Sequence, residues 1–521
     1  MASELSGSIW RQTLGDLLRR TAARFPQKPA IYCGEVAWTY AEFDRVCDSL
    51  AVGFASLGID VGDRVAVLSR NSHAVAAVRF ALARLGAQLV PINFKLNADE
   101  VAFILRHSGA HTLCVDVKHT QLGFDAVARG TAVEHLLGLP SEQSSATAEG
   151  LVNFFDLQIH GELPALEING ETLAQIIYTS GTESLPKGAL LSHENVISQY
   201  VSCLVDAEIA HDDVILHAMP LYHCAQLDAF LGPGIYVGAT NIITAKPAPD
   251  NLLALIEKFS ISSFFSPPTI WISLLRCALF DATNLASLRK GYYGASIMPV
   301  AVLQELQHRL PNVRLWNLYG QTEIAPVATV LKPEDQLRKA GSAGRATLNV
   351  ETRVVDANGN AAAVGEVGEI VHRSPQLMRG YYRDEERTRA AFAGDWFHSG
   401  DLGVIDEEGY LFVVDRKKDM IKSGGENVAS REVEEVLYRL AQIAEVAVIG
   451  LPDPHWIEAV TAVIVLKEGQ TLTEASASEH CKAHLAHFKV PKRIIFADAL
   501  PKSPSGKVLK RELRLRYQAA P

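Results

Sequence analysis

The sequence predicts an α/β protein with a large N-terminal domain followed by a small α+β C-terminal domain. Three observations support this prediction. The chain has 521 residues, enough for about three domain-sized units. Helical and strand patterns alternate through its first half and middle, as in layered α/β subdomains. After about residue 340, short strand patterns separated by Asn-Gly and Gly-rich turns indicate a β-rich subdomain.

The N-terminal elements are predicted from apolar spacing. Residues 13–25 have helical periodicity behind a threonine that can cap the helix. Residues 31–40 predict two short strands, and residues 43–58 predict an amphipathic helix that stops at its final glycine. The apolar runs RVAVLS and QLVPIN flank a helical stretch over 73–86. This β-α-β unit implies a parallel pair of strands.

The middle of the chain repeats the alternation. Buried strands are predicted over 174–180, 213–219, 240–245, 262–267 and 290–296, with helices over 252–259 and 302–310. Strands of the β-rich subdomain are predicted over 351–360, 365–373 and 410–415.

Residues 415–427 are polar and lack apolar periodicity, so we interpret them as a linker and loop. The segment after them predicts helix, strand, strand, helix and strand. We therefore place domain boundaries at 1–414 and 421–521, with a hinge over 415–420 about which the C-terminal domain moves.

Composition limits the class of protein. The apolar fraction is 48% and the charged fraction 21%, which excludes long disorder. The net charge of −10 makes nucleic acid a poor partner. No apolar run approaches the roughly 20 residues of a transmembrane segment, and no secretory signal is visible. The seven cysteines are scattered and form no C-x-x-C pair, so neither zinc nor disulfides are indicated. We expect a cytoplasmic protein.

The strongest chemical signal is the segment 178–188, YTSGTESLPKG, which follows a buried strand. Its small and hydroxyl residues allow backbone N–H groups to approach phosphate oxygens, and Lys187 supplies positive charge. The segment does not match a Walker A loop. Standing alone, it is also compatible with an ordinary turn.

Four more motifs follow in order: YGQTE at 319–323, WFHSGD at 396–401, DRKKD at 415–419 with SGGEN at 423–427, and PKSPSGK at 501–507. The ordered set resembles the adenylate-forming (AMP-binding) ligases, and among them the acyl-CoA synthetase and fatty-acid–CoA ligase family. Ser399 departs from the usual threonine but keeps a hydroxyl.

The resemblance implies an ATP-dependent carboxylic acid:CoA ligase that forms acyl-AMP and then acyl-CoA. It implies ATP, Mg²⁺ and coenzyme A as cofactor, metal and co-substrate. The largely apolar segments 221–227 and 267–271 favour a fatty or aryl acid, and the resemblance to the family favours a medium- or long-chain fatty acid. The alternatives are an aryl-acid CoA ligase or a stand-alone adenylation enzyme that loads a carrier protein, and a homodimer is left open.

The resemblance also assigns residues. Catalytic roles fall on Lys507, Glu323, Thr182 and His223. Nucleotide- and cofactor-binding roles fall on Thr179, Ser180, Gly181, Thr182, Lys187, Gly294, Ala295, Ser296, Tyr319, Gly320, Thr322, Asp401, Arg416, Gly424, Gly425 and Glu426. Glu323 is the expected Mg²⁺ ligand, because a hard cation prefers carboxylate and phosphate oxygens. Lys418 is the expected hinge residue, about which the C-terminal domain alternates between the two half-reactions.

Overall fold

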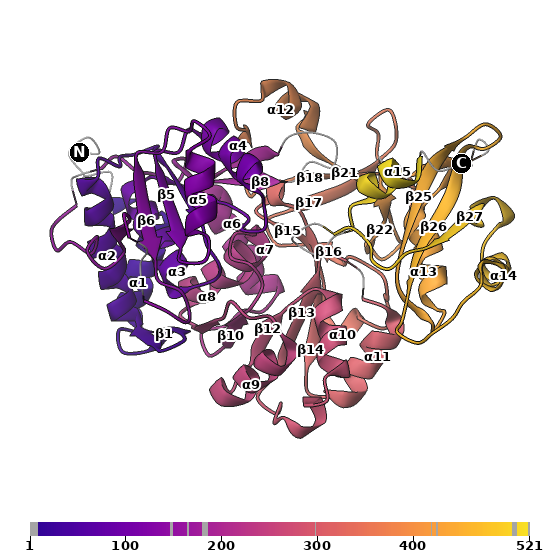
Figure 1. Ribbon diagram of the computed structural model, residues 1–521, viewed down its shortest axis with the longest axis horizontal. Coiled ribbons are helices and arrows are strands. Elements are labelled where there is room, and N and C mark those ends of the chain that lie inside the picture. Colours follow the sequence, from indigo (N-terminus) through magenta and orange to yellow (C-terminus); the bar gives the residue numbers. More distant parts are fainter. Residues whose placement is uncertain are drawn as a thin grey trace. The chain divides into compact units, whose positions relative to one another are not determined.

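The computed structural model describes residues 9–145, 149–163, 166–179, 186–296, 298–417, 419–423, 426–502 and 508–518. Within these residues the chain forms two compact units. The first comprises 9–179, 186–351 and 372–397, and the second comprises 352–371 and 398–518. Both units mix helices and sheets, which confirms the predicted α/β class (Figure 1).

One sheet of the first unit has the described strand order β19-β9-β8-β4-β3-β5-β6-β7. Its strands are β3 (Arg64–Leu68), β4 (Gln88–Pro91), β5 (Thr112–Asp116), β6 (His135–Leu139), β7 (Val152–Asn153), β8 (Leu173–Thr179), β9 (Lys187–Ser192) and β19 (Gly380–Tyr381). Strands β3 and β4 are parallel and joined through α3 (His73–Leu85), as predicted for the β-α-β unit. The pairs β8–β9 and β9–β19 are antiparallel.

The other sheet has the described order β16-β15-β14-β13-β12-β10-β11-β1-β2. Its strands are β1 (Pro29–Cys33), β2 (Val36–Thr39), β10 (Val214–His217), β11 (Thr240–Ile243), β12 (Ser263–Phe265), β13 (Lys290–Gly294), β14 (Arg314–Gly320), β15 (Val327–Leu331) and β16 (Arg345–Ala346). Helices α9 (Pro249–Phe259), α10 (Pro268–Arg276) and α11 (Val300–Arg309) lie beside β12–β14 (Figure 1). The strands predicted in the middle of the chain are confirmed.

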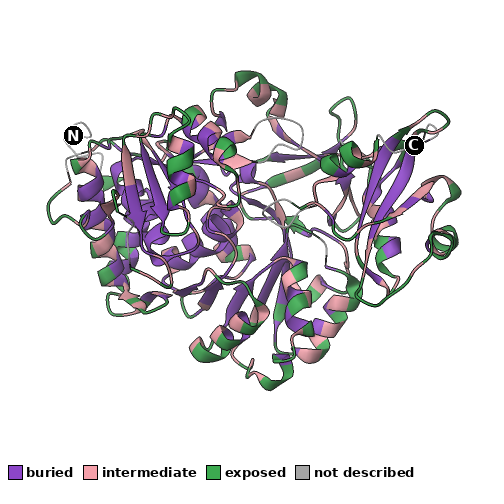
Figure 2. Cartoon of the chain, viewed as in Figure 1, coloured by how far each residue is buried: buried purple, intermediate pink, exposed green. Residues whose placement is uncertain are grey.

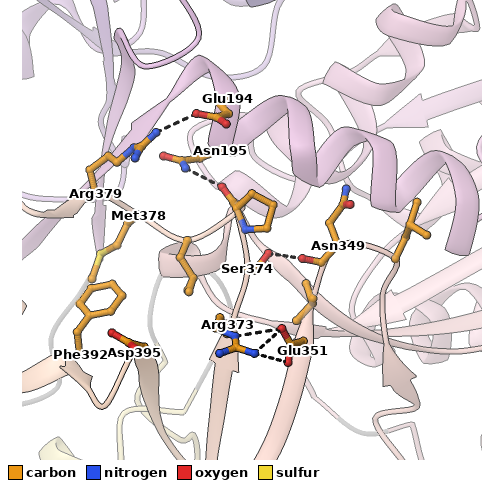
Figure 3. Close-up of a pocket in the computed structure, with 14 residues that line it drawn as sticks. Glu194, Asn195, Asn349, Glu351, Arg373, Ser374, Met378, Arg379, Phe392 and Asp395 are labelled. Carbon is orange, nitrogen blue, oxygen red and sulfur yellow. Dashed lines mark hydrogen bonds and ion pairs between the residues drawn. The ribbon is translucent and has the colours of Figure 1, made fainter.

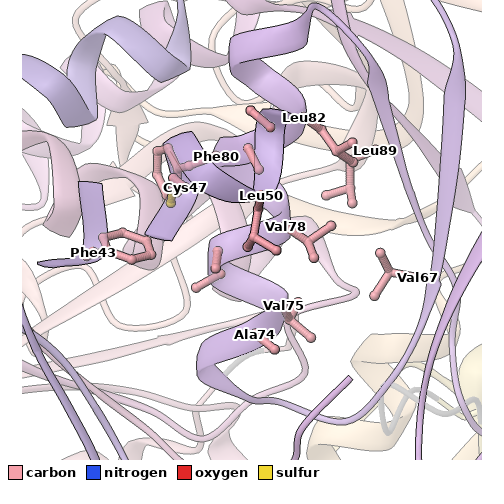
Figure 4. Close-up of a cluster of buried hydrophobic side chains, with 14 of the residues drawn as sticks. Phe43, Cys47, Leu50, Val67, Ala74, Val75, Val78, Phe80, Leu82 and Leu89 are labelled. Atoms are coloured by element: carbon pink, nitrogen blue, oxygen red, sulfur yellow. The ribbon is translucent and has the colours of Figure 1, made fainter. Parts of the chain in front are cut away.

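The core of the first unit contains the helix pair α2 (Tyr40–Ser56) and α3. All residues of α3 are buried, so this helix has no solvent-facing side. Phe43 and Leu50 of α2 pack with Val78 of α3 and Val67 of β3 in one apolar cluster (Figure 4). The strands around this cluster are also largely buried (Figure 2). The same cluster contains Ile31 of β1, so residues of both sheets pack against this helix pair.

Local sequence signals explain several helix ends. The Thr13 hydroxyl accepts from the Asp16 amide and the Asp16 carboxylate accepts from the Thr13 amide, a capping box that begins α1 (Leu14–Arg24). Helix α2 ends at Ser56, two residues before the predicted stop at Gly58, which takes a left-handed φ of 80°. The remaining helices of this unit are α4 (Ala98–Ser108), α5 (Thr120–Val127), α6 (His193–Asp206), α7 (Cys224–Gln226), α8 (Gly232–Val237) and α12 (Glu385–Ala391).

The β-rich part of the chain forms a third sheet of described order β17-β18-β21-β20, with β22 paired to β21. Its strands are β17 (Glu351–Val355), β18 (Gly368–Arg373), β20 (Phe392–Ala393), β21 (Trp396–Ile405) and β22 (Leu411–Arg416).

A fourth sheet has the described order β24-β23-β26-β25, with β27 paired to β26. Its elements are β23 (Ile421–Ser423), β24 (Glu426–Val428), β25 (Ile443–Asp453), β26 (Ile457–Leu466), β27 (Arg493–Phe496), α13 (Ser430–Tyr438), α14 (Glu474–His484) and α15 (Lys510–Gln518). The predicted helix, strand, strand, helix and strand after residue 430 are confirmed.

The interpretation of 415–427 as a linker and loop is wrong for part of that segment. Strand β22 continues to Arg416, and β23 pairs with β24 as an antiparallel hairpin. Ile421 and Val428 are buried in the apolar core of the C-terminal sheet. Two anchoring side chains are too few to create a visible period between polar residues, which explains why the pattern hid these strands.

Within the described residues, no helix combines the length and the apolar character that crossing a bilayer requires.

Candidate active site

The proposed phosphate loop connects the ends of strands β8 and β9. Thr179 is the last residue of β8 and pairs with Lys187, the first residue of β9. Ser180, Gly181 and Thr182 lie outside the described residues. The antiparallel ladder thus fixes both ends of the loop, and Lys187 belongs to the sheet itself.

The YGQTE segment lies at the end of β14. Gly320 has no room for a side chain, because a Cβ there would lie 2.0 Å from the Pro326 carbonyl oxygen. Thr322 and Glu323 follow in a single 3₁₀ turn, and both are buried. The Pro326 carbonyl therefore packs directly on the Gly320 backbone, just before the turn that carries Glu323.

Glu323 and Lys187 both contact Tyr381, a residue that the motifs did not indicate. The Tyr381 hydroxyl donates to Glu323 Oε1 at 2.9 Å, and Lys187 Nζ lies 4.9 Å from the centre of the Tyr381 ring. Burial, together with the charge of Glu323, raises the pKa of Tyr381 well above its usual value. The structure therefore brings together the lysine of the first motif and the carboxylate of the second.

Tyr319, the expected adenine platform, is half-buried at the end of β14. It packs against Ile324, Ala328 and Val350, and its ring centre lies 6.3 Å from that of His372. Burial lowers the pKa of His372 to about 4, so this imidazole is neutral at physiological pH. The platform is thus set among apolar and uncharged groups, which suit stacking on a flat base.

Gly294 ends β13, and its lack of a side chain is required by the neighbouring strand. A Cβ at Gly294 would lie 2.5 Å from the Leu318 carbonyl oxygen of β14. The two residues after it, Ala295 and Ser296, are exposed, and Ala295 takes a left-handed φ of 65°. Strained backbone of this kind is concentrated at functional sites.

His223 caps the short helix α7, and its Nδ1 atom accepts from the Ala225 amide at 3.1 Å. The next residue, Cys224, places its sulfur 3.3 Å from the Thr322 hydroxyl. Leu221 and Cys224 are both buried. The structure therefore joins the His223 segment to the YGQTE segment and gives it apolar neighbours.

The glycines near this segment serve packing. A Cβ at Gly232 would lie 2.0 Å from the Tyr200 ring, and one at Gly238 would lie 2.6 Å from the Phe25 ring. These positions thus admit neighbouring side chains of the protein.

A buried ion pair lies beneath the same region. Arg79 of α3 contacts Asp228 at 2.8 Å, and both side chains are almost fully buried. The other Asp228 oxygen accepts from Gln175 Nε2 at 2.8 Å, and Tyr200 donates to the first at 3.3 Å. Asp228 lies in a π-helical turn, Leu227–Leu231, directly after α7. The network joins β8, α3 and α6 to the chain that follows His223.

In the second unit, Asp401 and Arg416 face each other across the β21–β22 ladder. Arg416 Nε lies 2.6 Å from Asp401 Oδ1, and the aspartate is buried while the arginine side chain is 43% exposed. The Ser399 hydroxyl donates to the Ile370 carbonyl and accepts from the Asp401 amide. This double contact explains why serine can replace threonine at position 399.

Asp415 binds the start of helix α13. Its Oδ2 atom accepts from the Ser430 amide at 2.6 Å and from the Ser430 hydroxyl at 2.7 Å. Because Ala429 has no side-chain acceptor, Asp415 supplies the missing cap of this helix. Lys510 of α15 donates to the same Ser430 hydroxyl and pairs with Glu434 at 2.8 Å.

Of the remaining predicted residues, Glu426 pairs with Ser423 in the β23–β24 hairpin. Glu426 is exposed in β24. Lys418, Gly424, Gly425 and Lys507 lie outside the described residues.

A surface hollow of about 650 Å³ also lies on the first unit (Figure 3). Arg379 pairs with Glu194 at 3.0 Å on one side, and Arg373 pairs with Glu351 at 2.8 Å on the other. None of the described residues predicted for the site lines this hollow. We assign it no role in the chemistry.

Comparison with known proteins identifies the family. A model described as "AMP-binding enzyme" matches residues 18–382, and one described as "AMP-binding enzyme C-terminal domain" matches residues 432–507. The chain belongs to the AMP-binding enzyme family. The resemblance drawn from the five motifs is confirmed, and the protein is an AMP-forming acid–thiol ligase that acts through an acyl- or aryl-adenylate.

Relatives of this AMP-binding enzyme match along almost the whole chain. Feruloyl-CoA synthase of an Amycolatopsis species is 35% identical over 506 residues, which cover 97% of this chain and 99% of that protein. Long-chain-fatty-acid–CoA ligase FadD13 of Mycobacterium tuberculosis is 35% identical over 517 residues, covering 98% and 99%. The crystal structure of the anthranilate CoA ligase AuaEII with anthranoyl-AMP is similar with a TM-score of 0.90 and 26% identity, covering 100% of this chain and 99% of that one.

Proposed function

We propose that the protein is an ATP- and Mg²⁺-dependent acyl-CoA synthetase whose acid is a medium- or long-chain fatty acid. The observation that carries the proposal is the convergence of Lys187 and Glu323 on Tyr381. Lys187 and Glu323 belong to motifs that are far apart in the sequence, and both contact the same tyrosine. The lysine would neutralise phosphate charge, and the carboxylate would bind the accompanying Mg²⁺. The likeness to FadD13 supports a fatty acid.

The donor set fits Mg²⁺. Among the described residues, no three His, Cys, Asp or Glu side chains gather as an all-protein metal site would need. Mg²⁺ is usually bound by one or two carboxylates together with substrate phosphates and water, so Glu323 suffices as the protein ligand. Bound there, the ion would neutralise phosphate charge. Glu323 is buried and hydrogen-bonded to Tyr381, so its side chain would lose little conformational freedom on binding the ion.

The other site residues of the first unit would bind ATP and the acid. Thr179, Lys187 and the loop between them would hold the phosphates through backbone and side-chain donors. Tyr319 would stack on adenine. Ala295 and Ser296, exposed at a strained strand end, would lie against the nucleotide. His223 would lie beside the acid carboxylate.

Residues of the second unit would bind ribose and carry the two chemical steps. Asp401 would accept both ribose hydroxyls, with Arg416 beside it. The acid carboxylate attacks the α-phosphorus of ATP and releases pyrophosphate, while Lys507 stabilises the developing charge. The coenzyme A thiol then attacks the acyl carbon and AMP leaves. Rotation about Lys418 would exchange Lys507 for the 424–426 segment between these steps.

An aryl acid is the second candidate. Feruloyl-CoA synthase is as similar to this chain as FadD13 is, and the AuaEII structure holds an aryl adenylate. The two candidates share every step and differ only in the body of the acid.

A panel of carboxylates tests the proposal. Octanoate, dodecanoate, palmitate, ferulate, benzoate and acetate are each supplied with ATP, Mg²⁺ and coenzyme A, and kcat/KM is measured from pyrophosphate and thioester. Higher values for the fatty acids are expected. A clear preference for ferulate or benzoate would establish the aryl alternative, and no pyrophosphate with any acid would contradict both.

A matched pair of variants ties that activity to the site. Glu323→Gln should abolish most pyrophosphate release. Glu366→Gln, the same change at an exposed carboxylate, should leave it unchanged.

A further inference from the structure

Tyr381 makes contacts with two of the motifs that the proposed function uses. Its hydroxyl donates to Glu323 Oε1 at 2.9 Å, and its ring faces Lys187 Nζ at 4.9 Å. Its own backbone amide donates to the Thr388 hydroxyl. The first two contacts join positions that are far apart in the sequence, and one aromatic residue makes both.

The strand that carries Tyr381 is fixed on both sides. Strand β19 pairs with β9, where Tyr381 lies opposite Ala189, two residues beyond Lys187. The Met378 amide donates to the Glu323 carbonyl oxygen at 2.8 Å. Hydrogen bonds therefore connect the segment 378–381 to strand β9, which begins at Lys187, and to both the backbone and the side chain of Glu323.

We propose that Tyr381 is a positioning residue that orients the Glu323 carboxylate for Mg²⁺–ATP and keeps it in register with Lys187. This inference rests on the proposed function, because it acts through the residues assigned to ATP. A carboxylate has several lone-pair sites, so donation to Oε1 leaves capacity for a cation.

A role in packing alone would have a different signature. Tyr381 also contacts the buried cluster that contains Met378 and Phe397. Loss of packing would lower thermal stability and impair both half-reactions. Loss of positioning would affect only steps that involve the triphosphate and its metal.

The test uses the variant Tyr381→Phe, which keeps the ring that faces Lys187 and removes the hydroxyl. Its control is Tyr382→Phe, the same change one residue later, where the hydroxyl donates to the Ser108 carbonyl at 3.4 Å. Calorimetry measures the Kd of ATP at a series of Mg²⁺ concentrations. Pyrophosphate release gives the Mg²⁺ concentration for half-maximal rate, and thioester formation from supplied acyl-AMP gives the second half-reaction.

For Tyr381→Phe we expect both the Kd of ATP and the half-maximal Mg²⁺ concentration to rise about tenfold, as for a lost hydrogen bond to a charged group. The thioester step and the thermal midpoint should be unchanged. In a Glu323→Gln background, the same change should alter the Kd of ATP less than twofold, because the charge through which Tyr381 acts is absent.

Unchanged Mg²⁺ and ATP dependence in Tyr381→Phe would overturn the inference. So would equal losses in both half-reactions with a lower thermal midpoint, or the same tenfold effect in the Glu323→Gln background. Failure of the proposed function is separately visible, because the wild-type protein would then release no pyrophosphate with any acid, while the calorimetric arm still measures what Tyr381 does for ATP.

Discussion

Removing Arg79 should expose the energetic cost of the buried Asp228 carboxylate. Both side chains of the pair are almost fully buried, and they meet at 2.8 Å. Arg79→Met preserves much of the side-chain volume but leaves Asp228 without its counter-charge. Breaking a buried pair in this way costs about 3–5 kcal/mol, because an ion is left in a medium that solvates it poorly. A second change, Asp228→Asn, removes that ion and keeps an acceptor for Gln175.

Hydrogen exchange of α3 measures this cost where it arises, because the helix is buried along its whole length. Arg79→Met should speed exchange there by roughly a hundredfold or more, since each 1.4 kcal/mol is about tenfold. Arg79→Met/Asp228→Asn should recover at least about 2 kcal/mol of the loss. Arg129→Met serves as control, because its pair with Asp99 is exposed and worth at most about 1 kcal/mol.

The response to pH adds an independent check. Burial raises the pKa of Asp228 even beside Arg79. Without the arginine, protonation at low pH removes the buried charge, so the deficit of Arg79→Met should be smaller at pH 5 than at pH 8. A double variant no more stable than Arg79→Met, or a single variant indistinguishable from Arg129→Met, would refute the reasoning.

Three further predictions concern chemistry, pH and backbone packing. Lys507→Ala should slow acyl-AMP formation about 10²–10³-fold and spare thioester formation from supplied acyl-AMP, as expected for one preorganised charge used in the first step; equal losses in both steps would contradict this role. Burial lowers the pKa of His217 from 6.5 to about 4, so the unfolded chain binds a proton that the folded chain does not, and stability should fall between pH 6.5 and 4. This difference in pKa should lower the free energy of unfolding by roughly 3 kcal/mol over that pH range. In His217→Gln, the free energy of unfolding measured with urea should therefore fall less as the pH is lowered; a fall as steep as in the wild-type protein would contradict this. Gly320→Ala should abolish most pyrophosphate release because its Cβ would lie 2.0 Å from the Pro326 carbonyl, whereas Gly170→Ala, whose nearest neighbour lies at 3.5 Å, should remain active; full activity in Gly320→Ala would show that the turn can shift.

The sequence alone determined the element order of most of the protein. Strands such as β3 and β13 and helices such as α1 have apolar periods and caps that depend only on nearby residues. The five ordered motifs indicate the family without any tertiary contact. These signals depend on residues close together in the sequence, so they predict the element whatever its tertiary neighbours are. The hairpin β23–β24 has no such period, because its buried apolar residues Ile421 and Val428 are separated by polar residues.

Only the tertiary structure decided which distant residues meet. Tyr381 and Glu323 are 58 positions apart, Cys224 and Thr322 are 98 apart, and Arg79 and Asp228 are 149 apart. Hydrophobic periodicity tells which face of an element is buried, but it does not tell which element covers that face. The contacts of Tyr381 follow from the pairing of β19 with β9. A strand of two residues is too short to show a pattern in the sequence, so this pairing could not be predicted.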